Sequence, residues 1–340
     1  MSLTPARVLV PYPRGTQSGG PEALHQLVDS LRRLGADAWL WPWPESRDND
    51  RAADYERYDA PETTEMLDEL DTAVVLPETA LHLAGLWKKA SVVCWWLSID
   101  NSPYFQVRRL GHNERMDGAP LSFAMVRAFV GSQRRVLRDR AKFARMTHLA
   151  QSKYAFDFIR AALRVSPTLL GDYVPDVDPI RVKTADTLSI AFNPAKGKEL
   201  TDEIRSMSHP SLEWLPIQGL SREGVGSLLD RATVYLETGN QPGKDRIPRE
   251  AALHGCVILM LRKGAGRNSQ DCPLADEYKI EPGPMAGRRF ATALGHVFLD
   301  VAHHRAQQEP YLDMVLSDRG AFDRAVQGVF LEGRRGIDSW

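Results

Sequence analysis

The feature that most constrains the fold of this chain is a repeated alternation between short apolar runs and segments with helical periodicity. In the first half of the chain the apolar runs cover residues 7–10, 38–41, 73–76, 91–97 and 147–150. Apolar residues recur at helical spacing over 21–34 and 154–163, and Gly35 follows the first of these segments, as glycine often follows a helix. Strands that alternate with helices form βαβ units, so the sequence predicts a parallel sheet.

The same pattern starts again after a proline-rich, acidic stretch at residues 171–179, which is typical of a linker between domains. The second half has predicted strands at 188–192, 212–217, 234–237 and 257–261, and predicted helices at 198–207 and 223–229. Beyond residue 286 the pattern is largely helical to about residue 331. We therefore predict two α/β domains, residues 1–175 and 176–310, followed by a helical tail at 311–340.

The composition excludes several classes of protein. A length of 340 residues is enough for roughly two domains with a substantial core, and the formal net charge of −1 gives no sign of a nucleic-acid-binding surface. The three cysteines have neither a metal-ligand spacing nor the even number of a disulfide framework, and His303–His304 has no third ligand nearby, so we expect no metal site. No apolar run approaches the roughly 20 residues of a membrane helix, and the first residues lack the apolar part of a secretory signal. We expect a cytoplasmic protein.

The segment at residues 242–259 carries the densest chemistry in the chain. Its cations are Lys244, Arg246 and Arg249. Pro248 is suited to the first position of a helix, and the free N–H groups at a helix start form a ready site for an anion. An arginine can bind a phosphate through two parallel hydrogen bonds. The segment therefore predicts a phosphate or diphosphate site, in which Glu250 accepts hydrogen bonds from a sugar hydroxyl.

Two other loops follow predicted strands and are candidates for the same kind of ligand. Lys196 and Lys198 lie at the first strand-to-helix turn of the second domain, where they would face the same crevice as the cations of 242–259. Gly19 and Gly20 follow the first strand of the chain and permit a close approach of the backbone to a ligand, although they do not form the dinucleotide fingerprint. Solvated or flexible turns are the alternative explanation for both loops.

Aromatic and acidic residues surround the end of the apolar run at 91–97. Asp100 could orient or deprotonate a hydroxyl group, and Trp95, Trp96 and Tyr104 could provide a stacking surface for a sugar. The alternative is a turn at a strand end, in which Asp100 caps the backbone locally and the tryptophans belong to the core.

A predicted helix at residues 121–145 has a strongly basic face. Its cations are Arg134, Arg135, Arg138, Arg140, Lys142 and Arg145. Such a face is either simply solvated or contacts an anionic membrane surface or an acidic acceptor.

These segments together resemble the GT-B glycosyltransferases, and specifically the retaining nucleotide-sugar enzymes of family 4 (glycosyl transferases group 1). Residues 250–258 are similar to that family's Glu-Ala-Met-Ala-x-Gly-x-Pro-Val segment. The resemblance implies that Glu250 holds the donor ribose, that Gly19–Gly20 approaches the donor phosphates, and that Lys196 is part of the phosphate-binding Lys-Gly pair. It also implies two Rossmann-like domains that face each other across a cleft, with the helical tail packed back on the N-terminal domain.

The sequence departs from the family pattern at three positions. Pro242 stands where the first acid of the Glu-x7-Glu pair contacts the transferred sugar, and Ala191 stands where an arginine is expected. Asp100 lies in the loop where the family has a histidine. The sugar contact has then either shifted to Lys244 or Asp245 or been lost, so Asp100, Lys244 and Asp245 are the candidate catalytic residues.

The resemblance implies a transferase that uses a nucleotide diphosphate sugar as donor substrate, needs no further cofactor, and acts on a saccharide, a lipid-linked or a small-molecule acceptor. One alternative is a catalytically inactive GT-B-like protein that binds nucleotide sugars or serves as a scaffold. Another is an unrelated two-domain α/β enzyme, such as a nucleotide-dependent epimerase.

Overall fold

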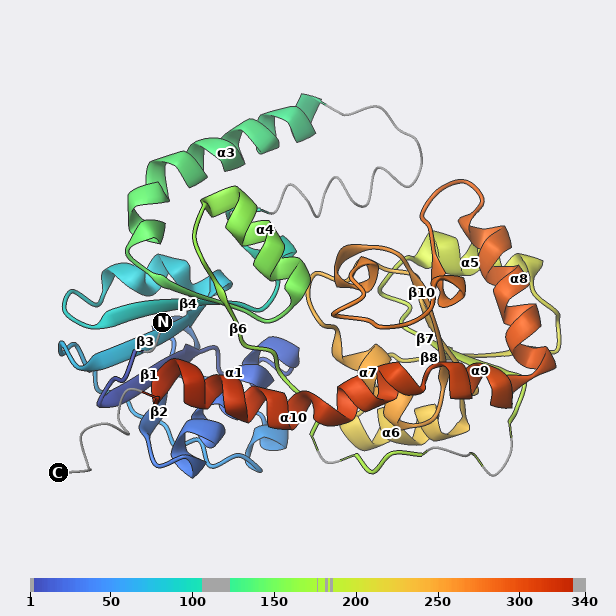
Figure 1. Cartoon of the computed structure of the whole chain (residues 1–340), viewed down its shortest axis with the longest axis horizontal. Helices are drawn as coiled ribbons and strands as arrows, with labels where there is room; N and C mark the ends of the chain where they lie inside the picture. Colours follow the sequence, from blue (N-terminus) through green and yellow to red (C-terminus); the bar gives the residue numbers. More distant parts are fainter. Residues whose placement is uncertain (1–2, 106–122, 176, 181–182, 184–185, 333–340) are drawn as a thin grey trace. The chain divides into compact units, whose positions relative to one another are not determined.

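A computed structural model describes residues 3–105, 123–175, 177–180, 183 and 186–332 of the chain (Figure 1). The described residues divide into two compact units. The first unit consists of the residues up to Tyr173 together with those from Arg319 onward, and the second unit runs from Val174 to Asp318. The chain therefore leaves the first unit and returns to it.

The first unit is built on a six-stranded parallel sheet with the strand order β2-β1-β3-β4-β5-β6. The strands are β1 Arg7–Tyr12, β2 Asp37–Pro42, β3 Thr72–Pro77, β4 Ser91–Trp96, β5 Thr147–Ala150 and β6 Thr168–Leu169. All six residues of β3 are buried, as expected of a central parallel strand that has both faces covered. The helices of this unit are α1 Gly19–Arg33, α3 Phe123–Ala144 and α4 Lys153–Leu163, with the 3-10 turns η1 Pro44–Ser46, η2 Ala53–Tyr55, η3 Glu78–Gly85 and η4 Ile99–Asn101.

The second unit repeats this plan with a five-stranded parallel sheet in the order β11-β10-β9-β7-β8. Its strands are β7 Ser189–Phe192, β8 Glu213–Pro216, β9 Val234–Glu237, β10 Val257–Leu261 and β11 Lys279–Ile280. Its helices are α5 Lys198–Met207, α6 Arg222–Arg231, α7 Arg246–Leu253, α8 Ala286–Leu299 and α9 Val301–Gln307, with the 3-10 turns η6 Gly264–Arg267 and η7 Asp276–Tyr278.

The last helix, α10 Glu309–Phe330, contributes to the cores of both units. Tyr311 and Val315 are buried among the side chains of the second unit. Further along the same helix, Phe322 and Phe330 are buried among those of the first unit, where Phe322 stacks on Trp95 with 6.3 Å between ring centroids. The helix is drawn in red in Figure 1.

The predicted strands and helices are confirmed, because each corresponds to an observed element with bounds that differ by only a few residues. The sequence did not reveal β6 and β11, which have two residues each and lie at sheet edges. The helical region beyond residue 286 is divided into α8, α9 and α10 because the chain breaks at Asp300, whose carboxylate accepts a hydrogen bond from the His303 N–H and caps α9. Residues 333–340 of the predicted tail lie outside the described residues.

Both sheets have the same reversal of strand order. In the first unit the chain moves from β1 outward to β2 and then crosses to β3 on the other side, and in the second it moves from β7 to β8 and crosses to β9. In sheets of this kind, ligands bind outside the carboxyl ends of the two strands where the order reverses. The topology thus directs attention to the loops after β1 and β3 and to those after β7 and β9.

Candidate functional site

The loops after β7 and β9 are in direct contact. The Lys196 ammonium in the first loop forms an ion pair with the carboxylate of Asp245 in the second, and the Thr238 hydroxyl donates to the Lys196 carbonyl at 3.1 Å. A Cβ atom on Gly197, which has a φ of +56°, would lie 2.5 Å from the Thr238 carbonyl oxygen. A Cβ atom on Gly239 would lie 2.6 Å from that of Lys196. Only glycine allows this approach, which brings the sequence-predicted Lys196 and Asp245 together.

Glu237, at the carboxyl end of β9, lies next to the Lys196 member of this ion pair. The Glu237 side chain is 2% exposed and accepts hydrogen bonds of 3.0 Å from the Tyr235 hydroxyl and the Gly239 N–H. Its carboxylate is 4.0 Å from the Lys196 ammonium. Burial raises the pKa of Glu237, and the charge of Lys196 opposes that rise. Burial alone would lower the pKa of Lys196, but Glu237 and Asp245 outweigh it and hold that pKa above its usual value.

Sequence reasoning missed Glu237. The available signal was an apolar strand that ends in an acid at the edge of the sheet where ligands bind. That signal becomes specific only when the strand order identifies β9 as one of the two strands at the reversal.

Helix α7 begins at Arg246, with Asp245 as its N-cap residue, so Pro248 occupies the third helical position and not the first as predicted. Proline is tolerated here because the N–H groups of the first helical turn have no partner within the helix. The earlier start places Arg246 and Glu250 one turn apart, and their side chains form an ion pair of 2.6 Å. Glu250 is buried at 5% exposure, and Arg246 fixes its orientation.

The other two cations of this segment are held by an acid on α10. Asp318 is 2.7 Å from the Lys244 ammonium and 3.3 Å from the Arg249 guanidinium. Arg249 is 2% exposed and also donates to the carbonyl oxygens of Lys244 and Asp245, at 3.0 and 3.2 Å. Sequence reasoning missed Asp318 because nothing in the chain indicates a contact between residues so far apart.

Lys198 stands apart from this cluster. It is the first residue of α5, and its exposed side chain forms an ion pair of 2.6 Å with Asp202 one turn further along. The structure therefore places two ion pairs, Lys196–Asp245 and Arg246–Glu250, on consecutive residues at the start of α7, with the buried Glu237 next to Lys196. Each of the five cations predicted to bind phosphate has an acidic partner.

In the first unit, Gly19 and Gly20 begin α1 directly after the β1 loop. A Cβ atom on Gly19 would meet no atom within 4 Å, and one on Gly20 would meet only Leu97, at 3.9 Å. The backbone at the start of this 15-residue helix is therefore open to approach. Asp100 lies in η4, which follows β4, and its side chain is 2% exposed.

A second buried acid supports the loop that carries Asp100. Glu78, at the carboxyl end of β3, accepts hydrogen bonds from the backbone N–H groups of Leu97 and Ser98 at 2.8 and 3.1 Å. Burial raises the pKa of Glu78 to about 7, and the hydrogen bonds to the backbone limit the rise. Glu78 and the Gly19–Gly20 loop thus occupy the two strand ends of the first unit's order reversal.

The aromatic residues of β4 belong to the core. Trp95 and Trp96 are fully buried, and their indole N–H groups donate to the Leu170 carbonyl at 2.9 Å and to His148 Nδ1 at 3.0 Å. Neither ring can act as a stacking surface, so the core alternative is the correct one for both.

The basic helix α3 has four exposed arginines, Arg134, Arg135, Arg138 and Arg140. Arg145, directly after the helix, is exposed as well. Lys142 instead donates to the Leu81 carbonyl at 2.9 Å. Leu137, on the same helix, is 66% exposed. Residues 121 and 122 of the predicted helix lie outside the described residues.

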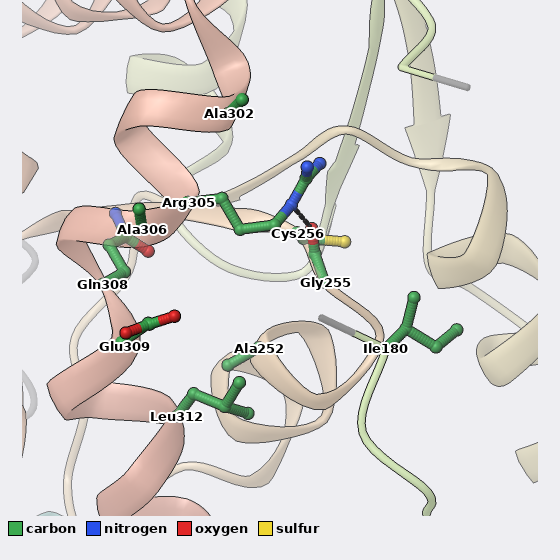
Figure 2. Close-up of a pocket in the computed structure, with 10 residues that line it drawn as sticks. All are labelled: Ile180, Ala252, Gly255, Cys256, Ala302, Arg305, Ala306, Gln308, Glu309 and Leu312. Carbon is green, nitrogen blue, oxygen red and sulfur yellow. Dashed lines mark hydrogen bonds between the residues drawn. The ribbon is translucent and has the colours of Figure 1, made fainter. Parts of the chain in front are cut away.

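A cavity of about 380 Å³ lies elsewhere in the second unit (Figure 2). It is lined by the turn before β10, by α9 and by the start of α10, and Arg305 spans one wall with a 2.8 Å hydrogen bond to the Gly255 carbonyl. This cavity lies at the amino end of β10, whereas the Lys196–Asp245 pair lies at the carboxyl end of the sheet. It is therefore separate from the candidate site. Over the described ranges, no helix is long and apolar enough to cross a membrane and no group of three side chains could hold a metal ion.

No family model and no curated protein sequence matches the chain. Solved structures do match it over almost its whole length. HepE from Anabaena, solved with UDP-glucose, is 12% identical, with a TM-score of 0.60 over 94% of this chain and 98% of its own. Sucrose-phosphate synthase from Thermosynechococcus elongatus is 10% identical, with a TM-score of 0.58 over 95% and 94%. A glycosyltransferase from Rickettsia africae is 11% identical, with a TM-score of 0.54 over 95% and 98%. The two parallel α/β sheets with C-terminal helices match the GT-B fold, which confirms the predicted fold class.

Proposed function

We propose that this chain is a glycosyltransferase that moves a sugar from a nucleotide diphosphate sugar to an acceptor. The observation that carries the proposal is the ionic cluster where the strand order of the second unit reverses, formed by Lys196, Asp245, Arg246 and Glu250. Ligands of such sheets bind at this edge. Structures of the same fold are described in complex with UDP-glucose and with UDP, which makes a uridine nucleotide the first donor to test.

In the proposed reaction the second unit holds the donor and stabilises the leaving diphosphate. Lys196 and Arg246 supply positive charge, and the backbone N–H groups at the start of α7 are proposed to face the same developing anion. Glu250 accepts hydrogen bonds from the ribose hydroxyls, in an orientation fixed by Arg246. Asp245, which pairs with Lys196, is the candidate contact to the transferred sugar in place of the acid that Pro242 replaces.

The first unit supplies the remaining candidates. The open backbone at Gly19 and Gly20 is proposed to approach a phosphate, and Asp100 is proposed to act on an acceptor hydroxyl. Because Asp100 is 2% exposed, its role requires the η4 segment to open when the acceptor binds.

A second candidate function is a protein that binds nucleotide sugars without transferring the sugar. Two observations favour it. Pro242 replaces the acid that the family resemblance places at the transferred sugar, and each of the cations expected to bind phosphate is paired with an acid inside the unit. A diphosphate must compete with these acids, so affinity and turnover are separate questions.

The test is a panel of nucleotide diphosphates and nucleotide sugars, measured first by thermal shift and then by release of free nucleotide diphosphate. If the protein is a glycosyltransferase, one nucleotide sugar raises its melting temperature, and the corresponding nucleotide diphosphate is released when an acceptor is supplied. A shift without release, across saccharide, lipid-linked and small-molecule acceptors, supports the binding protein instead. The absence of a shift with any nucleotide contradicts both functions.

Two variants locate the nucleotide within the second unit. Glu250→Gln removes the carboxylate proposed to hold the ribose and is expected to abolish the shift. Glu213→Gln is the matched control, because Glu213 is an exposed acid of the same unit in a 3.0 Å ion pair with Arg231 on the surface. An unchanged shift in Glu250→Gln would remove Glu250 from the site.

We also infer that the exposed arginines of α3 contact an anionic membrane surface. Each basic side chain near such a surface contributes about 1 kcal/mol, and the exposed Leu137 adds an apolar contact. The double variant Arg134→Glu/Arg138→Glu is expected to lose sedimentation with phosphatidylglycerol vesicles. The control is Arg288→Glu on α8, where the arginine is also exposed. Equal sedimentation of the native protein and the double variant with phosphatidylglycerol vesicles would contradict the inference. Sedimentation of the native protein with neutral phosphatidylcholine vesicles to the same extent as with phosphatidylglycerol would contradict it as well.

A further inference from the structure

We propose that Lys244, Arg249 and Asp318 form a brace that positions the start of α7, and that the two cations are not ligands of the donor phosphates. The proposal rests on the proposed function, because it assigns these three side chains a positioning role in nucleotide binding. It also separates the predicted phosphate-binding cations into two classes, since Lys196 and Arg246 remain next to Asp245 and Glu250 at the strand ends.

The centre of the brace is the carboxylate of Asp318. One of its oxygens is 2.7 Å from the Lys244 ammonium, and the other is 3.3 Å from the Arg249 guanidinium. The three side chains are 8%, 11% and 2% exposed, in the order Asp318, Lys244 and Arg249. A buried acid that binds two buried cations satisfies charges that would otherwise be costly to remove from water. These charges are thus committed to one another within the protein.

Arg249 connects this centre to the backbone. Its guanidinium donates to the carbonyl oxygens of Lys244 and Asp245, the two residues immediately before the first residue of α7. In a trans peptide the N–H group points opposite to the carbonyl of the preceding residue. With the carbonyls of Lys244 and Asp245 held toward Arg249, the N–H groups of Asp245 and Arg246 point away from it. The brace therefore fixes the direction of two backbone donors at the helix start.

The brace and a direct phosphate contact predict different ligand dependence. A lysine that binds the second phosphate contributes more to the affinity for UDP than to that for UMP. A brace orients the start of α7, the helix that also carries Glu250. Its loss therefore weakens the binding of both nucleotides by the same factor. The ratio of the two dissociation constants thus separates the two roles.

The experiment measures UDP and UMP binding by calorimetry for Lys244→Met and Asp318→Asn. In both variants the affinity for each nucleotide is expected to fall by about tenfold, the usual effect of losing a hydrogen bond to a charged group. The double variant is expected to bind both nucleotides as tightly as either single variant does, because the residues act as one unit. Asp323→Asn is the matched control, since Asp323 lies on the same helix in a 3.0 Å ion pair with Arg33 of the first unit, and it should leave both affinities unchanged.

A selective loss of UDP affinity in Lys244→Met, with UMP unaffected, would show that Lys244 binds phosphate and would overturn the proposal. Unchanged or tighter binding in Asp318→Asn would overturn it as well. Lys244→Met retains the Arg249–Asp318 pair and so keeps the test informative if Asp318→Asn does not fold.

A second readout separates failure of the brace from failure of the proposed function. If the native protein binds neither nucleotide, the proposed function fails in this form, and the brace is judged by hydrogen exchange. Backbone amides at 238–246 are expected to exchange faster in Asp318→Asn or Lys244→Met than in the native protein and in Asp323→Asn. Equal exchange in all four proteins would show that the three side chains do not hold this loop.

Discussion

The two units share one strand order but have different chemistry where that order reverses. In the second unit the loops after β7 and β9 bring together Lys196, Asp245 and the buried Glu237, so charged side chains are in contact. In the first unit the corresponding strand ends carry the open Gly19–Gly20 backbone and Glu78, whose carboxylate binds backbone N–H groups. The comparison shows that the topology fixes where a ligand can bind, whereas the residues after the strands decide which ligand it is.

The glycines of the two units provide the largest contrast. Gly197→Ala is expected to destabilise the second unit by about 3 kcal/mol, because its backbone is left-handed and the added Cβ would meet the Thr238 carbonyl oxygen, which cannot move easily. Gly19→Ala, in open space, is expected to change stability by less than about 0.5 kcal/mol. Urea unfolding of each variant checks both values. Equal losses in the two variants would contradict the contrast.

The buried acid of the first unit predicts a pH dependence. The folded-state pKa of Glu78, about 7, is raised above its ordinary value of 4.5, so its contribution to stability is full below pH 4.5 and is lost as the pH rises through 7. The loss amounts to roughly 3 kcal/mol at most.

The measurement is the free energy of unfolding between pH 4.5 and 8 for the native protein and for Glu78→Gln. The difference between the two proteins should change over this range, because only the native side chain titrates. The Cys94 thiol on β4 interacts with Glu78, but its pKa is raised well above its ordinary value, so it stays neutral over this range. Parallel curves for the two proteins would contradict the prediction.

The smallest effect is expected at Lys198. Its ion pair with Asp202 is exposed at both ends, and such solvent-screened pairs on helices contribute little to stability. Lys198→Ala should therefore lower stability only slightly and leave nucleotide affinity unchanged. Lys196→Ala, in contrast, should lower nucleotide affinity. A loss of UDP affinity in Lys198→Ala would return that lysine to the site.

The sequence predicted the fold well because parallel strands buried on both faces, such as β3 and β10, are nearly continuous apolar runs. It also indicated the loops that carry the Lys196–Asp245 pair, since Lys196 and the start of α7 follow such strands. It could not show how the charges pair. Asp318 meets Lys244 only because α10 packs in the second unit, and a two-residue error at the start of α7 concealed the Arg246–Glu250 pair.

Helix α10 has a consequence for the order in which the protein folds during synthesis. The ribosome makes the strands of the first unit before those of the second, and domains commonly fold as they emerge. Phe322, Val326 and Phe330 nevertheless belong to the core of the first unit and follow the whole of the second unit in the chain. The unit that is synthesised first is therefore the one that is completed last, with part of its apolar surface exposed while the second unit is being made.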